Sequence, residues 1–133
     1  MTHRPATLSD ASFLLHVRND AHTRAMCFRD HEVGIEDILG RGETYIASLD
    51  GIDYGYFQIE DTVGQIEVSW YIAPEHRRKG YGHILMRGLL KQARSPFGPI
   101  VAAVKVQNIA SLILAEQYMT RVLKHNGVVC FTA

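Results

Sequence analysis

Arg77-Arg78-Lys79-Gly80-Tyr81-Gly82 is a basic, glycine-containing segment that lies between two regular elements. The residues before it, Gln65 to Ile72, read as a strand that stops at Ala73-Pro74. After it, apolar residues recur with helical spacing from near His83 to about Ala93, which predicts an amphipathic helix. This order of strand, basic loop and helix limits both the fold and the kind of site that the chain can form.

The loop has the chemistry of a phosphate site. The N–H groups at the start of a helix have no partners within the helix and carry partial positive charge, so they bind phosphate oxygens. Gly80 and Gly82 let the backbone approach an anion closely. A solvated basic turn that only caps the helix is the alternative, and the flanking strand and helix favour the phosphate site. Two nucleotide-binding loops are excluded, because the GxxxxGK motif is absent and Leu85 replaces the third glycine of GxGxxG.

Antiparallel strands precede the loop. Thr44 to Leu49 alternates as a strand and ends at a hairpin signal, Asp50-Gly51, after which Asp53 to Glu60 returns. A second turn near Asp61 to Gly64 leads into the strand before the loop. The three strands therefore form a meander.

The N-terminal part adds short elements. Ala6-Thr7-Leu8 closes a first strand, and Ser9 or Asp10 caps a helix that extends through Val17. Ile35 to Leu39 forms a second short helix.

The C-terminal part reads as connector, strand, helix and strand. Ser95 to Pro99 is the connector, and the apolar run Ile100 to Val106 predicts a strand that is buried on both faces. Asn108 caps a helix that continues through Val122, and Asn126-Gly127 turns into a last strand, Val128 to Thr132. The whole element order predicts an α+β layered domain with a mixed sheet.

Composition excludes several classes of protein. The 133 residues fit a single domain, 1–133, and 47% apolar with 21% charged residues is typical of globular proteins. A formal net charge of zero argues against nucleic-acid binding. Cys27 and Cys130 are far apart without metal-site spacing, so we expect no metal and two free thiols. We recognise no signal peptide or membrane span, which predicts a cytoplasmic protein without a membrane partner.

The loop resembles the coenzyme-A loop of the GNAT acetyltransferase superfamily, in which Arg or Gln is followed by x-x-Gly-x and then Gly or Ala. The residues that match are Arg77, Gly80 and Gly82. Asn108-Ile109-Ala110-Ser111 resembles the superfamily's N-x-x-S element. Val17 to Asp20 with Arg24 resembles a subgroup, some members of which acetylate amino-sugar nucleotides. The resemblance covers nearly the whole chain in element order.

This resemblance implies a three-layer α/β/α fold. Its sheet would be mixed and mostly antiparallel, with a central V-shaped split between Gln65 to Ile72 and Ile100 to Val106. Acetyl-CoA would lie with its pantetheine arm in the split and its pyrophosphate on the loop. The cofactor-binding residues would be Trp70, Tyr71, Ile72, Arg77, Arg78, Lys79, Gly80, Tyr81, Gly82, His83, Asn108 and Ser111.

Acetyl transfer to an amine needs a base, and the leaving thiolate gains from a proton donor. Glu67 is the candidate base, and a solvent-facing residue in a cross-strand ion pair is the open alternative. Related enzymes commonly carry Tyr four residues after the N-x-x-S element, where this chain has Ala115. Tyr118, one helical turn further, is the candidate acid, and a core aromatic is the alternative.

The acceptor site is expected between Arg18 and Gly42, with Arg18, Arg24 and Arg29 as substrate-binding candidates. The mixed charges of this segment suit an amino sugar, an amino acid, a polyamine or a protein amine equally well. A catalytically weak or inactive module that binds acetyl-CoA or another protein is the competing function.

The C-terminus reads as trimmed relative to the superfamily. The Gly-Phe pair that usually follows the last helix is absent, and one final strand stands where two are typical. Because a missing strand leaves an open sheet edge, we predict that a second subunit covers it in a homodimer.

Overall fold

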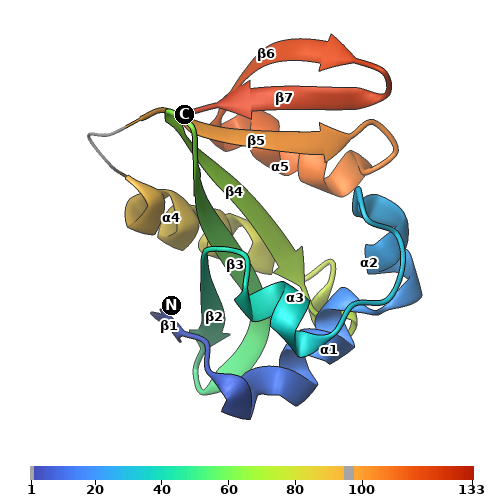
Figure 1. Cartoon of the computed structure of the whole chain (residues 1–133), viewed down its shortest axis with the longest axis vertical. Coiled ribbons are helices and arrows are strands. Elements are labelled where there is room, and N and C mark those ends of the chain that lie inside the picture. Colours follow the sequence, from blue (N-terminus) through green and yellow to red (C-terminus); the bar gives the residue numbers. More distant parts are fainter. Residues whose placement is uncertain (1, 95–97) are drawn as a thin grey trace.

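A computed structural model describes residues 2–94 and 98–133 (Figure 1). The N-terminal elements are β1 (Thr2–Pro5), the 3-10 turn η1 (Leu8–Asp10), α1 (Ala11–Arg18), α2 (Ala21–Met26) and α3 (Ile35–Leu39). The meander consists of β2 (Glu43–Leu49), β3 (Ile52–Thr62) and β4 (Gln65–Ile72), and η2 (Pro74–His76) follows it. The remaining elements are α4 (Tyr81–Ala93), β5 (Ile100–Lys105), α5 (Ile109–Tyr118), β6 (Thr120–His125) and β7 (Val128–Thr132).

The strands form a seven-stranded sheet in the order β1-β2-β3-β4-β5-β7-β6. Neighbouring strands are antiparallel, except that β4 and β5 run parallel. β4 and β5 pair at Ile66–Ile100 and Glu67–Val101, and from there they diverge (Figure 1). The predicted V-shaped split in a mixed, mostly antiparallel sheet is therefore confirmed.

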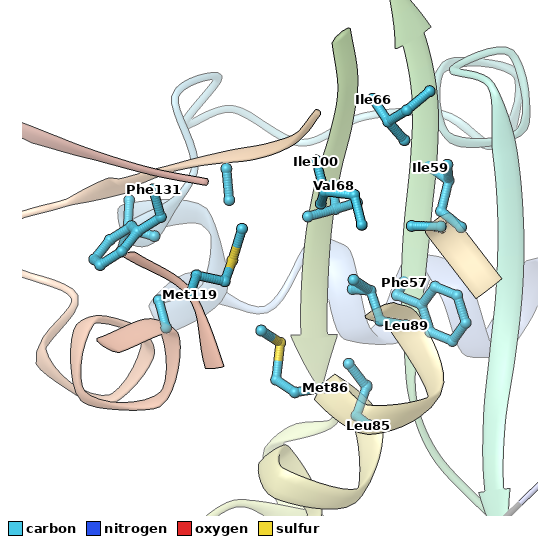
Figure 2. Close-up of a cluster of buried hydrophobic side chains, with 14 of the residues drawn as sticks. Phe57, Ile59, Ile66, Val68, Leu85, Met86, Leu89, Ile100, Met119 and Phe131 are labelled. Carbon is cyan, nitrogen blue, oxygen red and sulfur yellow. The ribbon is translucent and has the colours of Figure 1, made fainter. Parts of the chain in front are cut away.

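Apolar side chains hold one helical layer on each face of the sheet. On one face, residues of β3 and β4 pack against α4 and the C-terminal strands, as Figure 2 shows for Phe57, Val68, Leu85, Leu89 and Phe131. On the other face, Leu14 and Val17 of α1 and Ile38 of α3 cover Ile46 and Tyr56. Each fully buried aliphatic side chain of this kind contributes roughly 1.5–3 kcal/mol of transfer free energy.

Several predicted bounds are exact, and others need correction. The bounds of α3, β4 and β7 agree with those predicted. β1 ends before Ala6, because Asp10 accepts a 2.9 Å hydrogen bond from the Thr7 N–H and folds Leu8–Asp10 into a turn. β5 is not buried on both faces: Ala103 is exposed, because it faces a cavity in the split. Of the predicted connector, residues 95–97 lie outside the described residues.

The prediction of a helix through Val122 followed by a single final strand was wrong. α5 ends at Tyr118, and the next residues form β6, which pairs with β7 across a turn at Asn126 and Gly127. Both turn residues have positive φ, 49° and 76°, as tight β-hairpins require. The strand that we expected to be missing is present, so the reason given above for a homodimer no longer holds.

The described residues contain neither a membrane-spanning helix nor a metal-binding cluster. Within residues 2–94 and 98–133, no helix is long and apolar enough to cross a membrane. Within the same ranges, no cluster of three or more His, Cys, Asp or Glu side chains is arranged to hold a metal ion.

Candidate active site in the split of the sheet

A cavity of about 610 Å³ occupies the split between β4 and β5. Its wall contains residues from both faces of the sheet, because side chains alternate along a strand. Trp70 and Ile72 belong to the face that packs on α4 and α5. Glu67, Ser69 and Tyr71 alternate with them and border the cavity on the α1–α3 side. The cavity therefore connects the two helical layers through the sheet.

The start of α4 forms one end of this cavity. Gly80 is the N-cap residue, with φ of 81°, and a Cβ added to it would meet nothing within 4 Å. Gly80, Gly82 and His83 line the cavity, so the first-turn N–H groups of α4 border open space. Arg78 also lines it, whereas Lys79 is exposed on the loop outside the wall. The backbone and charge at this end fit a phosphate or pyrophosphate.

The Arg77 side chain makes contacts at α2 that the sequence did not indicate. Its Nη2 donates to Asp20 Oδ2 at 2.8 Å and to Thr23 Oγ1 at 2.7 Å. The same carboxylate caps α2 by accepting from the Thr23 N–H at 3.1 Å. Hydrogen bonding from Arg77 lowers the pKa of Asp20 from its ordinary value. The Arg77 side chain, predicted to surround a pyrophosphate, is thus engaged in holding α2 against the loop.

The N-x-x-S element lies on the opposite side of the split. Asn108 Oδ1 accepts from the Ser111 N–H at 3.3 Å, which confirms its role as the cap of α5. Trp70 Nε1 donates to Ser111 Oγ at 3.2 Å, so a hydrogen bond spans the split between β4 and α5. The structure brings these three predicted cofactor-binding residues together on the cavity wall.

Tyr71 and Tyr81 take different positions from those three residues. The ring of Tyr71 stacks on Tyr56 at 4.5 Å on the α1–α3 side, so only the backbone of Tyr71 faces the other half of the split. Tyr81 lines the cavity and stacks on Tyr54 at 4.4 Å.

Glu67 faces the cavity opposite a second acid. Its cross-strand partner on β3 is Glu60, which also lines the cavity. Glu67 is exposed, as the alternative reading expected, but among the described residues it has no ion pair and its cross-strand partner is an acid, so the ion-pair part of that alternative is wrong. Like charges directly opposite one another destabilise a sheet unless a cation lies between them. Two facing carboxylates suit a site that receives a protonated amine.

Tyr118 lies outside the cavity wall and contacts it through His83. The Tyr118 hydroxyl is 3.1 Å from His83 Nδ1, and His83 lines the cavity. Ala115, at the position where a tyrosine is common in the superfamily, is fully buried. The role of Tyr118 as an acid stays a prediction, and its hydroxyl contacts the cavity wall at His83.

Of the three arginines predicted to bind substrate, two line the cavity and one does not. Arg18 is buried, donates to the Arg29 carbonyl oxygen at 2.6 Å, and lines the cavity together with Arg29. Arg24 is not on the cavity wall, and its Nε is buried without a partner in the described chain. Arg41 also lines the cavity, and sequence reasoning did not single it out.

Lys105 of β5 contacts α2 and the residues that follow it. Lys105 Nζ donates to the Ala25 carbonyl oxygen of α2 at 3.3 Å and lies 6.0 Å from the centre of the Phe28 ring. α2 is therefore tied both to the loop before α4 and to the strand on the far side of the split.

Comparison with known proteins agrees with this geometry. A family model described as the acetyltransferase (GNAT) family matches residues 10–119. A ribosomal-protein-alanine N-acetyltransferase from Brucella melitensis matches with TM-score 0.81 and 21% identity, over 100% of this chain and 99% of that one. The protein yncA of Salmonella typhimurium, solved with its cofactor acetyl-CoA, matches with TM-score 0.73 and 25% identity over 99% and 90%.

A third solved structure is a spermidine N-acetyltransferase from Vibrio cholerae in complex with CoA and spermine. It matches with TM-score 0.79 and 16% identity, over 98% of this chain and 92% of that one. No curated protein sequence matches the chain.

Proposed function

The chain belongs to the GNAT acetyltransferase family, and from that premise we propose that it transfers an acetyl group from acetyl-CoA to a primary amine. The acceptor is a small polar molecule or a protein amine, and it attacks directly in a ternary complex. One observation carries the proposal: a single cavity joins the start of α4 to the facing carboxylates of Glu60 and Glu67.

Acetyl-CoA is the cofactor, and it supplies an activated acetyl thioester. The N–H groups at the start of α4 and the Arg78 side chain are suited to its pyrophosphate, because both line the cavity and carry positive charge. Trp70, Asn108 and Ser111 border the split where the pantetheine arm would lie. β4 has no β5 partner beyond Glu67, so the N–H groups there that point away from β3 are available to stabilise negative charge.

The acceptor end supplies the proton transfer. A primary amine is protonated near neutral pH, and it must lose a proton before it attacks. Glu67 accepts that proton, and Glu60 opposite it adds a second negative charge that draws the ammonium group to the cavity wall. On the cofactor side, His83 Nδ1 lies 3.1 Å from the Tyr118 hydroxyl, and the pair can pass a proton to the leaving thiolate.

A thiol-release assay tests this function. The protein is mixed with acetyl-CoA and a panel of amines, and free CoA is followed with a thiol reagent. Amine-dependent release is the expected result. Tight acetyl-CoA binding without CoA release for any amine would favour the competing function, a cofactor-binding module. The observation that motivates this alternative is Ala115, which stands where related enzymes commonly carry a tyrosine. A cytoplasmic location and a homodimer stay predictions.

A further inference from the structure

The acceptor end of the cavity has a second region, whose charge is opposite to that of the two glutamates. A recess of about 10 Å³ lies between α1, α3 and the β3–β4 surface, and Arg18, Arg29, Arg41, Tyr56 and Tyr71 are among its lining residues. The three arginines also line the main cavity, so the recess adjoins the acceptor site. Its volume is close to that needed to hold a single water molecule.

The positive charge of this recess is only partly neutralised. Asp37 is the acid among the recess residues, and its Oδ1 is 3.8 Å from Arg29 Nη2. Arg18 donates to carbonyl oxygens, which carry no formal charge. The Arg41 side chain makes no ion pair or hydrogen bond with any other described residue. Two of the three guanidinium groups therefore lack a counter-charge.

A buried hydroxyl at the recess also lacks a partner. Tyr56 is 0% exposed, and its hydroxyl has no hydrogen-bond partner in the described chain. Burial raises the pKa of Tyr56 well above its ordinary value, so the phenol stays protonated and keeps a hydrogen to donate. Buried hydroxyls normally have a partner, and an anionic oxygen in the recess would accept this hydrogen bond.

We propose that the acceptor amine carries an anionic group, such as a carboxylate, on the same molecule. The anionic oxygen binds among Arg18, Arg41 and the Tyr56 hydroxyl, and the ammonium group lies at Glu60 and Glu67. The amine end of this inference rests on the proposed function. A polyamine is disfavoured as the acceptor, because its second cation would face the arginines.

The sheet register gives the spacing between the two charged regions. The cross-strand pairs Tyr56–Tyr71 and Glu60–Glu67 lie on the same face, four residues apart along each strand. Four residues of strand span about 13 Å. Glutamate and arginine side chains are long enough to shorten this span, so the amine and the anion would be separated by a chain of several atoms.

Matched pairs of acceptors test the proposal. 4-Aminobutyrate and 6-aminohexanoate are compared with butylamine and hexylamine, which lack the anion; 3-aminopropylphosphonate tests a second anionic chemistry, and spermidine a second cation. The anionic amines should have kcat/KM at least tenfold above the alkylamines of equal length, as expected for one charge-assisted hydrogen bond. Equal or better use of alkylamines or spermidine would overturn the inference.

Variants locate the effect in the recess. Arg41→Gln should raise KM for the anionic amines about tenfold with kcat within twofold, and so reduce their preference over the alkylamines. Tyr56→Phe removes only the unpartnered hydroxyl and should likewise raise KM for the anionic amines. The control is Arg87→Gln, since Arg87 is exposed on α4 away from the cavity wall. An unchanged preference in Arg41→Gln contradicts the proposal.

A binding measurement separates this inference from the proposed function. The protein saturated with CoA is titrated calorimetrically with 4-aminobutyrate and with butylamine. Arg41-dependent binding of 4-aminobutyrate without any turnover would support the anion site while refuting catalysis. Turnover without a preference for the anionic amines would support catalysis while refuting the anion site. Equal affinity for the two compounds, or binding of neither, would refute the anion site.

Discussion

Replacing Glu67 with Gln should abolish most turnover and at the same time stabilise the protein. Glu67 faces Glu60 across β4 and β3, and no counter-charge is paired with Glu67 among the described residues. The amide keeps the size of the side chain and removes one of two facing negative charges. Loss of a general base typically lowers kcat by about 10²–10⁴-fold.

The gain in stability follows from the register. Directly opposed residues on antiparallel strands have Cβ atoms about 5 Å apart, and like charges at that distance in a solvated site cost roughly 0.5 kcal/mol. For a chain of this length, that difference corresponds to a rise of about 2 °C in Tm. Glu60→Gln should give a similar rise, and the double variant less than the sum, because both changes remove the same repulsion.

Steady-state kinetics, calorimetry with acetyl-CoA and thermal melts measure these effects separately. Acetyl-CoA affinity should stay within twofold in Glu67→Gln, because Glu67 lies at the acceptor end. Glu32→Gln is the matched control, since Glu32 is an exposed glutamate outside the cavity wall. Near-normal kcat in Glu67→Gln would refute its role as base, and a lower Tm would refute the repulsive pair.

Four further predictions concern the cofactor side of the cavity and the contact between Arg77 and Asp20, the cap of α2. Gly82→Val should weaken acetyl-CoA binding at least tenfold, because even a Cβ there would lie 3.1 Å from a leucine of α5 at the edge of the phosphate site; unchanged affinity by calorimetry would contradict this. Trp70 is the only tryptophan, so intrinsic fluorescence should change on acetyl-CoA binding as its hydrogen bond across the split breaks, and a flat titration at saturation would argue against cofactor in the split. The pKa of Asp20 is lowered in the folded protein, so its contribution to stability is present above about pH 4 and is lost as pH falls through the folded pKa. Melts of Asp20→Asn should therefore show a lower Tm than wild type at pH 7, and the difference should shrink as pH falls below about 4. Tyr118→Phe should lower kcat less than tenfold, because the hydroxyl reaches the cavity only through a histidine, whereas a 10²-fold loss or more would identify a direct acid.

Part of this site could be read from the sequence, and part required the sheet register. The loop and β4 were predictable because Ala73-Pro74 stops the strand and the glycines mark the start of α4. The pairing of Glu60 with Glu67 could have been predicted. In a hairpin with a tight turn at Val63 and Gly64, residues at equal distances from the turn lie opposite each other, and this pairs Glu60 with Glu67. We missed it because the turn was placed only approximately.

Other features gave weaker signals. The hairpin at Asn126-Gly127 requires a strand on both sides, but every residue of β6 is exposed, so the segment shows no alternation between buried and exposed positions. The engagement of Arg77 with Asp20 could not be predicted, because it joins residues 57 positions apart and depends on how α2 packs on the loop. The recess around Tyr56 likewise arises only where three separate segments meet.

The bond between Arg77 and Asp20 also gives the molecule a means of communication between its two ligands. Arg77 belongs to the loop that would hold the cofactor, and Asp20 caps the helix that covers the acceptor end. A shift of the loop on cofactor binding would therefore be transmitted to α2 through this ion pair. Thermodynamic reciprocity then requires that each ligand change the affinity of the other by the same factor. We therefore predict cooperative binding of donor and acceptor through Arg77, which lines the cavity and bonds to Asp20 of α2.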